Sequence, residues 1–152
     1  ELNETFDSAT CLYDSLNYIL EPEKLRAAFA QVGKHIERGG FWVFDMNSEW
    51  ALVADLFTQS NLNPRQSLNY DWRAHFDKNS RICSVKMKFQ RRDKNGELET
   101  FYETHRERAY SLDEVTQMLE STGWKLRYSF DAYTLNRPHD RSERWFFVAQ
   151  KS

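Results

Sequence analysis

Cysteine is scarce in this sequence, and the two that occur are poorly spaced for the chemistry that cysteine usually supports. Cys11 and Cys83 are the only cysteines among 152 residues, and they form no CxxC pair. This argues against both a disulfide framework and a zinc site. The four histidines show no HxH or HExxH spacing, so we expect no bound metal.

Long apolar runs and an excess of one charge are also missing. The longest apolar stretches are far shorter than the roughly 20 residues needed to cross a bilayer, and no signal-peptide pattern opens the sequence. Lys and Arg number 21 against 23 Asp and Glu, which gives a net charge of −2. Without a basic excess a dedicated nucleic-acid binder is not expected. We therefore expect a cytoplasmic protein that binds neither membranes nor nucleic acids.

Aromatic side chains, in contrast, are plentiful. The chain has eleven Phe, seven Tyr and five Trp, and 40% of its residues are hydrophobic. These are enough to close a core, which argues against disorder. The length suits one domain or a piece of a larger one. The chain opens with Glu1 instead of Met and runs at once into a strand-like segment, so we expect that its beginning has been removed.

The first 48 residues predict a strand–helix–strand unit. Residues 6–11 are a short apolar run followed by a polar loop, which is typical of a buried strand. Pro22 suits the first turn of a helix, an apolar stripe follows, and Gly39-Gly40 is expected to end the helix. Residues 41–44 are uniformly apolar, which predicts a strand covered on both faces of a parallel sheet. The apolar stripe of the predicted helix consists of Leu25, Phe29, Val32 and Ile36.

The middle of the chain predicts an antiparallel meander. Ser48 is a suitable N-cap for a helix over 48–59, and a loop is expected at 61–65. Alternating apolar and polar residues predict strands at 68–76 and 83–89. A third, unusually polar strand is expected from 97 to about 109. Turn-like sequences separate them at 77–80 and 93–96, where Asn95-Gly96 is a strong hairpin signal. We interpret residues 67–109 as a meander inserted into an α/β plan.

The last third predicts a helix and two strands. Ser111 and Glu114 have the spacing of a capping box, and Gly123 is expected to stop the helix that they begin. Strands are expected around 126–132 and at 145–149. The whole chain therefore belongs to the α/β class.

Polar side chains follow both strands of the first unit. In parallel sheets ligands bind at the carboxyl ends of the strands, so these side chains should gather at one edge. Capping of loops and helices is the competing interpretation for each of them. The residues concerned are Asp14, Ser15, Asn17, Asp45 and Asn47.

Three segments stand out beside the order of the elements. They are Phe6-Asp7-x-x-x-Cys11-Leu12-Tyr13-Asp14-Ser15-Leu16-Asn17-Tyr18, Gly39-Gly40-Phe41-Trp42-Val43-Phe44-Asp45-Met46-Asn47, and Glu103-x-His105-x-Glu107-Arg108-Ala109-Tyr110-Ser111. Their sequences and order resemble class I S-adenosylmethionine-dependent methyltransferases of the small-molecule type, and the resemblance spans essentially the whole chain. It implies a partial Rossmann-like methyltransferase sheet: strand–helix–strand, an antiparallel meander insert, a helix and two closing strands.

The sequence departs from this family at one point. The glycine-rich first loop that receives the amino-acid end of the cofactor has no counterpart, and neither does the acidic residue that holds the ribose. The resemblance therefore implies that residues 1–152 are the carboxyl-terminal part of one methyltransferase domain. We expect this part alone to be inactive and to bind S-adenosylmethionine weakly. The strand at 6–11 would have an unpaired edge, and that edge or the meander offers a surface for a homodimer.

The resemblance also assigns roles to individual residues. It implies a small-molecule acceptor with S-adenosylmethionine as cofactor, and it makes Asp14 or Asp45 the candidate general base. It places Cys11, Leu12, Asp14 and Ser15 against the cofactor. For the acceptor it suggests Asn17, Asn47, Tyr70, His105 and Arg106.

Purely structural interpretations compete with these roles. Tyr70 can pack between sheet and helix, and the charged residues at 103–108 can form a solvated strand face with cross-strand pairs. Tyr18 is expected to be a core aromatic. At the level of the whole chain, the alternatives are a non-catalytic α/β binding module on the same scaffold and a different small α/β enzyme.

Overall fold

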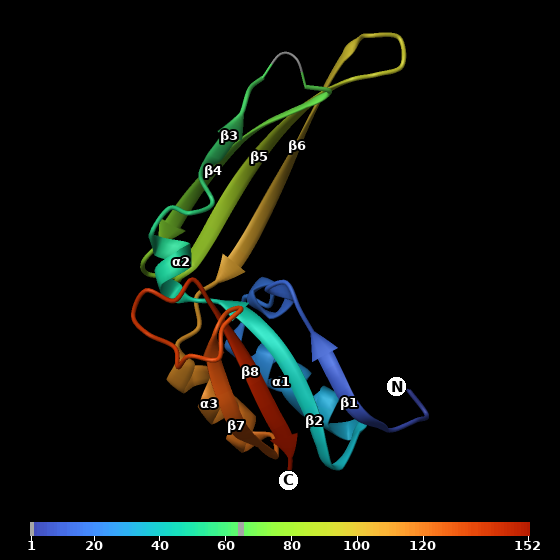
Figure 1. The fold of residues 1–152 in the computed structure, drawn as a ribbon, viewed down its shortest axis with the longest axis vertical. Coiled ribbons are helices and arrows are strands. Elements are labelled where there is room, and N and C mark those ends of the chain that lie inside the picture. Colours follow the sequence, from blue (N-terminus) through green and yellow to red (C-terminus); the bar gives the residue numbers. More distant parts are fainter. Residues whose placement is uncertain (1, 64–65) are drawn as a thin grey trace.

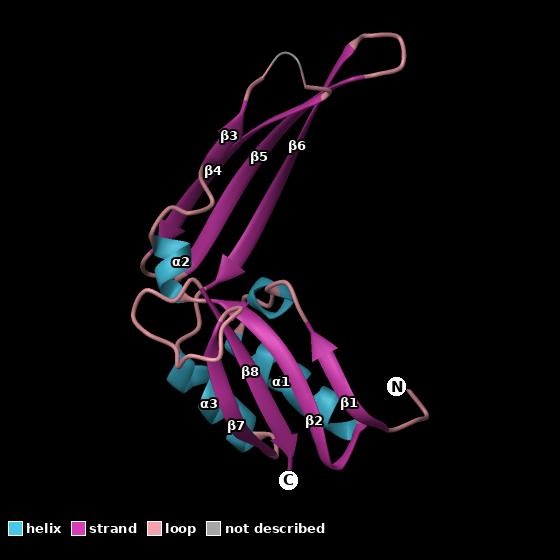
Figure 2. Ribbon diagram, viewed as in Figure 1, coloured by secondary structure: helices cyan, strands magenta, loops and turns pink. Residues whose placement is uncertain are grey.

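The computed structural model describes residues 2–63 and 66–152. Two four-stranded sheets are joined end to end, with a long arm projecting from a compact base (Figure 1, Figure 2). The elements are β1 (Phe6–Cys11), η1 (Ser15–Tyr18), α1 (Pro22–Lys34), β2 (Ile36–Asn47), α2 (Glu49–Val53), β3 (Gln59–Asn61), β4 (Leu68–Asp77), β5 (Ile82–Arg92), β6 (Leu98–Arg108), α3 (Leu112–Ser121), β7 (Trp124–Asp131) and β8 (Arg144–Lys151).

The base is built on a mixed sheet in the order β1-β2-β8-β7. The pair β1–β2 is parallel, whereas β8 is antiparallel to both of its neighbours. The predicted strand–helix–strand unit and the two closing strands are therefore confirmed. Strand β1 lies at the edge of this sheet, as expected.

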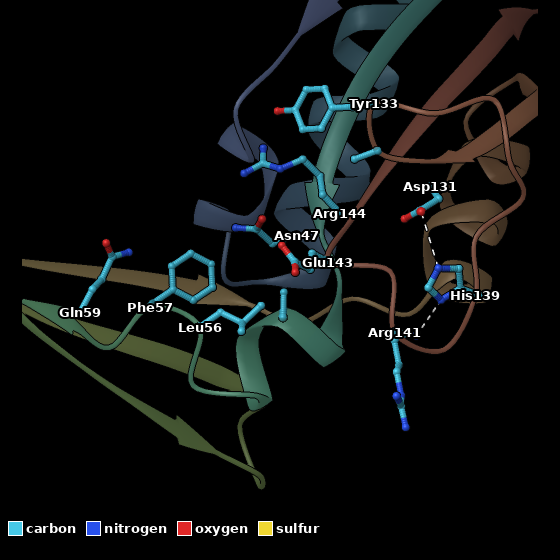
Figure 3. A pocket seen from close by; sticks show the side chains of 12 residues that line it. Asn47, Leu56, Phe57, Gln59, Asp131, Tyr133, His139, Arg141, Glu143 and Arg144 are labelled. Atoms are coloured by element: carbon cyan, nitrogen blue, oxygen red, sulfur yellow. Dashed lines mark hydrogen bonds and ion pairs between the residues drawn. The ribbon is translucent and has the colours of Figure 1, made fainter.

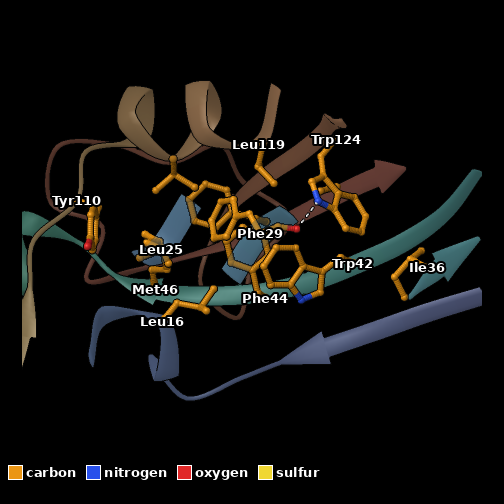
Figure 4. Packing of buried hydrophobic residues seen from close by; sticks show 13 residues of the cluster. Leu16, Leu25, Phe29, Ile36, Trp42, Phe44, Met46, Tyr110, Leu119 and Trp124 are labelled. Carbon is orange, nitrogen blue, oxygen red and sulfur yellow. Dashed lines mark hydrogen bonds between the residues drawn. The ribbon is translucent and has the colours of Figure 1, made fainter. Parts of the chain in front are cut away.

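One aromatic-rich core lies between this sheet and the helices α1 and α3, which cover the same face (Figure 4). Phe29 of α1 packs edge-to-face on Trp42 of β2, with ring centroids 5.0 Å apart, and Phe44 stacks on Phe147 of β8. The indole of Trp124 is buried and donates to the Phe29 carbonyl at 3.1 Å. The aromatics expected to close a core do so here.

The prediction that β2 is covered on both faces is wrong for the residues that the structure describes. Phe41 is 41% exposed, and Val43 is half-buried. The core cluster lies on the face of Trp42 and Phe44. Helices α1 and α3 both pack on this one face. A uniformly apolar run therefore does not show that both faces of a strand are covered.

The predicted end of the first helix is also wrong. Helix α1 stops at Lys34, and Ile36 already pairs with Phe6 of β1. Gly39 and Gly40 lie inside β2, where the pairing with β1 shifts from Phe6↔Ile36 to Ser8↔Phe41. Gly39 has a φ of +84°, and a Cβ on Gly40 would lie 2.6 Å from the Asp7 carbonyl oxygen. The two glycines therefore form an irregularity in the strand and do not cap the helix.

The arm is an antiparallel sheet in the order β3-β4-β5-β6. The three predicted meander strands are present, and a short strand β3 pairs with β4 in addition. The helix predicted over 48–59 is shorter than expected, because α2 ends at Val53 and residues 59–61 join the sheet. Ser48 does cap it, accepting from the Ala51 amide at 3.1 Å. Of the loop expected at 61–65, residues 64 and 65 lie outside the described residues.

A second, smaller core lies between α2 and the arm. Leu52 of α2 packs with Cys83, Val85 and Ala109, and Phe57 and Trp72 lie against this cluster.

The capping box of α3 is complete: the Glu114 amide donates to Ser111 Oγ and the Ser111 amide to the Glu114 carboxylate. No helix in the described part of the chain is long and apolar enough to cross a membrane.

Candidate functional site

The carboxyl ends of β1 and β2 meet the end of β6 and the start of β8 at the junction of base and arm (Figure 1). Polar side chains from β2, β6 and β8, from the loop after β1 and from η1 form one connected network. We call it the junction cluster. Its members are Asp14, Asn17, Asp45, Asn47, Glu107 and Arg144.

Arg144 binds both carboxylates of the cluster. Its guanidinium lies 2.9 Å from Asp14 Oδ1 and 2.5 Å from Asp45 Oδ2. The remaining Asp45 oxygen accepts from the Asp14 amide at 3.1 Å. Burial lowers the pKa of Arg144, but hydrogen bonds to Asp45 and the charge of Asp14 outweigh it and leave that pKa above its usual value. The guanidinium is therefore a permanent cation between two acids.

Asn47 connects the acids to Glu107. Its amide Nδ2 donates to Asp14 Oδ2 at 3.0 Å and to Glu107 Oε2 at 2.7 Å. Glu107 is 4% exposed, and its Oε1 accepts none of the hydrogen bonds found among residues 2–63 and 66–152. Burial raises the pKa of Glu107 to about 7, although the Asn47 bond opposes this. Glu107 can therefore exchange a proton near neutral pH.

Asn17 is bound to the backbone at the end of β2. Its Oδ1 accepts from the Asn47 amide at 2.9 Å, and its Nδ2 donates to the carbonyls of Asn47 at 3.1 Å and Arg108 at 3.0 Å. The side chain is fully buried. Its burial does not support the predicted contact with an acceptor, because every donor of the amide is already used within the protein.

The loop after β1 has an unusual backbone. Tyr13 and Asp14 both have positive φ, at 60° and 51°, which is uncommon outside glycine. Leu12 is 41% and Tyr13 79% exposed. Cys11 is half-buried, and Ser15 Oγ donates to the Leu12 carbonyl at 2.8 Å. The four residues predicted to touch a cofactor thus lie together at the end of β1: Leu12 points its apolar side chain outward, whereas Cys11 packs against the core.

His105 reaches the same region through Tyr18. The Tyr18 hydroxyl lies 2.7 Å from His105 Nδ1, and His105 Nε2 lies 3.0 Å from Glu103. Tyr18 is 44% exposed, so the expectation of a core aromatic is wrong. Its hydroxyl pairs with the arm instead, which holds η1 against β6.

A cavity of about 470 Å³ opens beside the cluster (Figure 3). Leu56, Phe57 and Gln59 line it from the arm side, and Tyr133 from the β7–β8 connection. Asn47 and Arg144 belong to both the cavity wall and the junction cluster. The other lining residues are Ala51, Asp131, Ala132, His139, Arg141 and Glu143.

The structure thus brings together some of the predicted site residues and separates others. Asp14, Asn17, Asp45 and Asn47 meet at one strand edge, as the sheet topology implies. Tyr70 packs on Trp72 along the arm, 5.2 Å between ring centroids. Arg106 alternates with its neighbours in β6, so it points to the opposite face of the arm from His105 and Glu107. Neither contacts the junction cluster.

Two residues central to the cluster were not predicted as site residues. Glu107 occurs in a segment quoted for the resemblance, but its burial could not be inferred from a run of charged residues. Arg144 directly precedes the strand predicted at 145–149 and belongs to no distinguishing motif. Among the described residues no group of three or more His, Cys, Asp or Glu side chains is placed to hold a metal ion.

Comparison with known proteins identifies the fold. No family model matches the chain. Two curated relatives, the predicted methyltransferase YqeM of Bacillus subtilis and a predicted methyltransferase of Geobacillus sp. (strain WCH70), are 30% and 29% identical over 149 and 150 residues. These matches cover 97% of this chain but 59% and 60% of the relatives. The chain thus spans about three-fifths of their length.

A crystal structure of an S-adenosylmethionine-dependent methyltransferase from Clostridium acetobutylicum superposes on all of the chain. The TM-score is 0.89 at 27% identity, and the match covers 61% of that protein. The coverage agrees with the carboxyl-terminal part that the missing glycine-rich motif implied. The chain therefore has the fold of the S-adenosylmethionine-dependent methyltransferases, of which it holds about three-fifths.

Proposed function

We propose that this chain serves S-adenosylmethionine-dependent methyl transfer to a small-molecule acceptor. The observation that carries the proposal is the junction cluster. It places three carboxylates at the strand edge where this fold binds ligands, directly beside a cavity. The whole protein's activity rests on residues beyond the matched part as well.

The loop after β1 fits one side of the cofactor. Leu12 and Tyr13 expose apolar surface next to the Asp14 carboxylate, which suits a flat ring with polar edges. Cys11 and Ser15 complete the loop. Residues 1–152 contain no glycine-rich loop for the other end of the cofactor. We therefore propose that Cys11, Leu12, Asp14 and Ser15 form one wall of a site that further residues complete.

We propose the neighbouring cavity as the acceptor site. About 470 Å³ is within the range of small-molecule pockets, and Phe57 and Tyr133 give it an aromatic lining. Asn47 and Arg144 separate it from Asp14. We propose Asn47 beside the acceptor, whereas the positions of Tyr70 and Arg106 on the arm, away from the junction cluster, favour other roles.

When bound, S-adenosylmethionine supplies an activated methyl group, so positioning of the acceptor provides much of the rate. The residues of this chain can remove the acceptor's proton. Asp14 and Asp45 were the predicted bases, but Arg144 binds both. Glu107 is buried, has an oxygen without a partner in the described part of the chain, and has a pKa of about 7. Glu107 does not itself line the cavity but is bound to Asn47, which does. We propose Glu107 as the group that takes up the acceptor's proton, with Asp14 and Asp45 as positioning residues.

Calorimetric titration of S-adenosylmethionine tests the cofactor assignment. We expect the natural full-length protein to bind with a micromolar dissociation constant and residues 1–152 alone to bind much more weakly. Failure of the full-length protein to bind would contradict the proposal and favour the non-catalytic module. Tight binding by residues 1–152 alone would contradict the proposal that further residues complete the cofactor site.

Transfer of a labelled methyl group to a small-molecule extract tests the reaction. The label should appear in a low-molecular-weight product. Glu107→Gln should reduce transfer at least tenfold without weakening cofactor binding, whereas the matched Glu103→Gln should retain it. Equal transfer by both variants would remove Glu107 from the mechanism.

A homodimer through the arm or the β1 edge stays a prediction, which sedimentation of the full-length protein can test.

A further inference from the structure

The two faces of the arm differ sharply in character. Paired residues of neighbouring strands share a face, and successive residues alternate. One face therefore carries Trp72, Met87 and Val85, and it packs on α2. The opposite face points away from the junction cluster. We call it the basic face and define it by Arg73, Lys86, Lys88, Arg106 and the aromatic Tyr102.

The basic face carries cations whose placement does not stabilise the sheet. Arg73 lies directly opposite Lys86, an arrangement that destabilises a sheet. Lys88 follows two residues after Lys86 on the same strand, about 6.6 Å along it. Two carboxylates lie beside these cations: Asp71, which is opposite Lys88 and is bound by Arg73 at 2.8 Å, and Glu103, which lies 3.0 Å from His105. No ion pair of Lys86, Lys88 or Arg106 is found within residues 2–63 and 66–152.

An exposed aromatic lies among these cations. Tyr102 pairs with Lys88 and is 72% exposed. A shallow hollow of about 360 Å³ runs beside it, lined by Arg73, Lys86, Lys88 and Thr104 among others. The net charge of −2, from which no nucleic-acid binding was expected, hides a local excess: residues 68–108 carry ten of the 21 Lys and Arg but seven of the 23 Asp and Glu.

We propose that the basic face binds a single-stranded nucleic acid. Lys and Arg neutralise phosphates, the threonine hydroxyl can donate to phosphate or sugar, and an exposed Tyr on a sheet can stack on an unpaired base. A membrane surface fits less well, because Leu98, 54% exposed, is the single large aliphatic side chain that this face exposes among the described residues. The face lies opposite the proposed transfer site, so this partner is docked and is not the methyl acceptor. The inference is independent of the proposed function.

Fluorescence anisotropy with a labelled single-stranded RNA of about 15 nucleotides tests the proposal. The full chain should bind it, and affinity should fall as salt is raised. The double variant Lys86→Glu with Lys88→Glu should bind at least tenfold more weakly. Its plot of log K against log salt should be shallower by about 1.4, because each lost phosphate contact removes about 0.7. Tyr102→Ala should weaken binding without changing that slope.

A matched control variant shows whether RNA binding depends on the basic face or on the overall charge of the protein. Lys34→Glu with Lys125→Glu makes the same charge change on exposed positions of the base, and it should bind RNA as the parent does. Equal loss in both double variants would overturn the proposal, as would absence of RNA binding by the parent. Tighter binding to phosphatidylserine vesicles or duplex RNA, or an unchanged affinity of Tyr102→Ala, would overturn it too. DNA of the same sequence shows which sugar is preferred, and circular dichroism confirms that each variant is folded.

Discussion

The side chain of Asn17 pairs with the backbone of Asn47 as a neighbouring strand would. Oδ1 accepts from the Asn47 amide at 2.9 Å and Nδ2 donates to the Asn47 carbonyl at 3.1 Å. The same Nδ2 reaches the Arg108 carbonyl, so one amide connects η1 to both the base and the arm.

Replacing Asn17 should destabilise the protein strongly. Asn17→Ala leaves a buried amide and two carbonyls without partners, and each costs about 1–3 kcal/mol. We expect a loss of roughly 3 kcal/mol in the free energy of unfolding, measured with urea. Asn95→Ala, in an exposed turn, is the matched control and should lose less than about 1 kcal/mol. A similar, small loss in both variants would show that the Asn17 bonds contribute little.

Removing the cation of the junction cluster should be more costly than removing a surface one. Arg144→Met leaves Asp45, which is 2% exposed, as an unpaired buried charge. The expected loss is about 3–5 kcal/mol. Arg26→Met breaks an exposed pair with Glu23 on α1 and should cost about 0.5 kcal/mol. Urea unfolding of both variants gives the comparison, and equal losses would contradict an ion-pair role for Arg144.

Glu107 should make the stability depend on pH. Its pKa is raised from 4.5 to about 7 by burial, so between these values the folded state holds a proton that the unfolded state releases. The free energy of unfolding should therefore fall as the pH rises from about 4.5 to about 7, by roughly 3 kcal/mol at most. The contribution of Glu107 to the free energy of unfolding should be largest below pH about 4.5 and should be lost above pH about 7.

The Glu107→Gln variant isolates this effect. Gln stays neutral, so the pH-dependent loss between about 4.5 and 7 should disappear and the variant should be more stable than the parent at pH above about 7. Glu103→Gln changes an exposed carboxylate and should keep the slope. Unfolding at several pH values measures both, and a slope that survives in Glu107→Gln would assign it to another group.

Gly40 should not tolerate a side chain. An added Cβ would lie 2.6 Å from the Asp7 carbonyl oxygen and 2.8 Å from Ile36 Cγ2, so the paired backbones must separate. Gly40→Ala should cost about 1–3 kcal/mol. Gly96→Ala meets nothing within 4 Å and carries only the strain of its φ of +85°, about 1 kcal/mol. Equal melting temperatures for the two variants would contradict this.

Local patterns predicted most of the fold because each element carries its own signal. Alternation marked β4 and β5, the Asn95-Gly96 turn marked the hairpin that leads into β6, and the Ser111–Glu114 spacing marked the start of α3. The same kind of signal failed at Gly39-Gly40, because glycine suits a helix end and a strand irregularity equally. Helix α2 was predicted too long, since the pairing of residues 59–61 with β4 is a tertiary contact that the local pattern does not contain.

The candidate site was predictable only where topology brings strand ends together. Asp14, Asp45 and Asn47 follow or end neighbouring parallel strands, so their proximity follows from the fold. Arg144 lies 99 positions beyond Asp45, and it reaches the cluster because β8 inserts beside β2. Glu107 looks like one more charge on a polar strand, and only the packing of the arm on the base buries it.

The position of β8 has a consequence for synthesis. It lies between β2 and β7, although both precede it in the sequence. While a ribosome is still adding residues 144–151, the two halves of the base sheet have no strand to join them, and Phe44 lacks the ring of Phe147 on which it stacks. The nascent base should therefore remain open, and dependent on chaperones, until this segment leaves the exit tunnel.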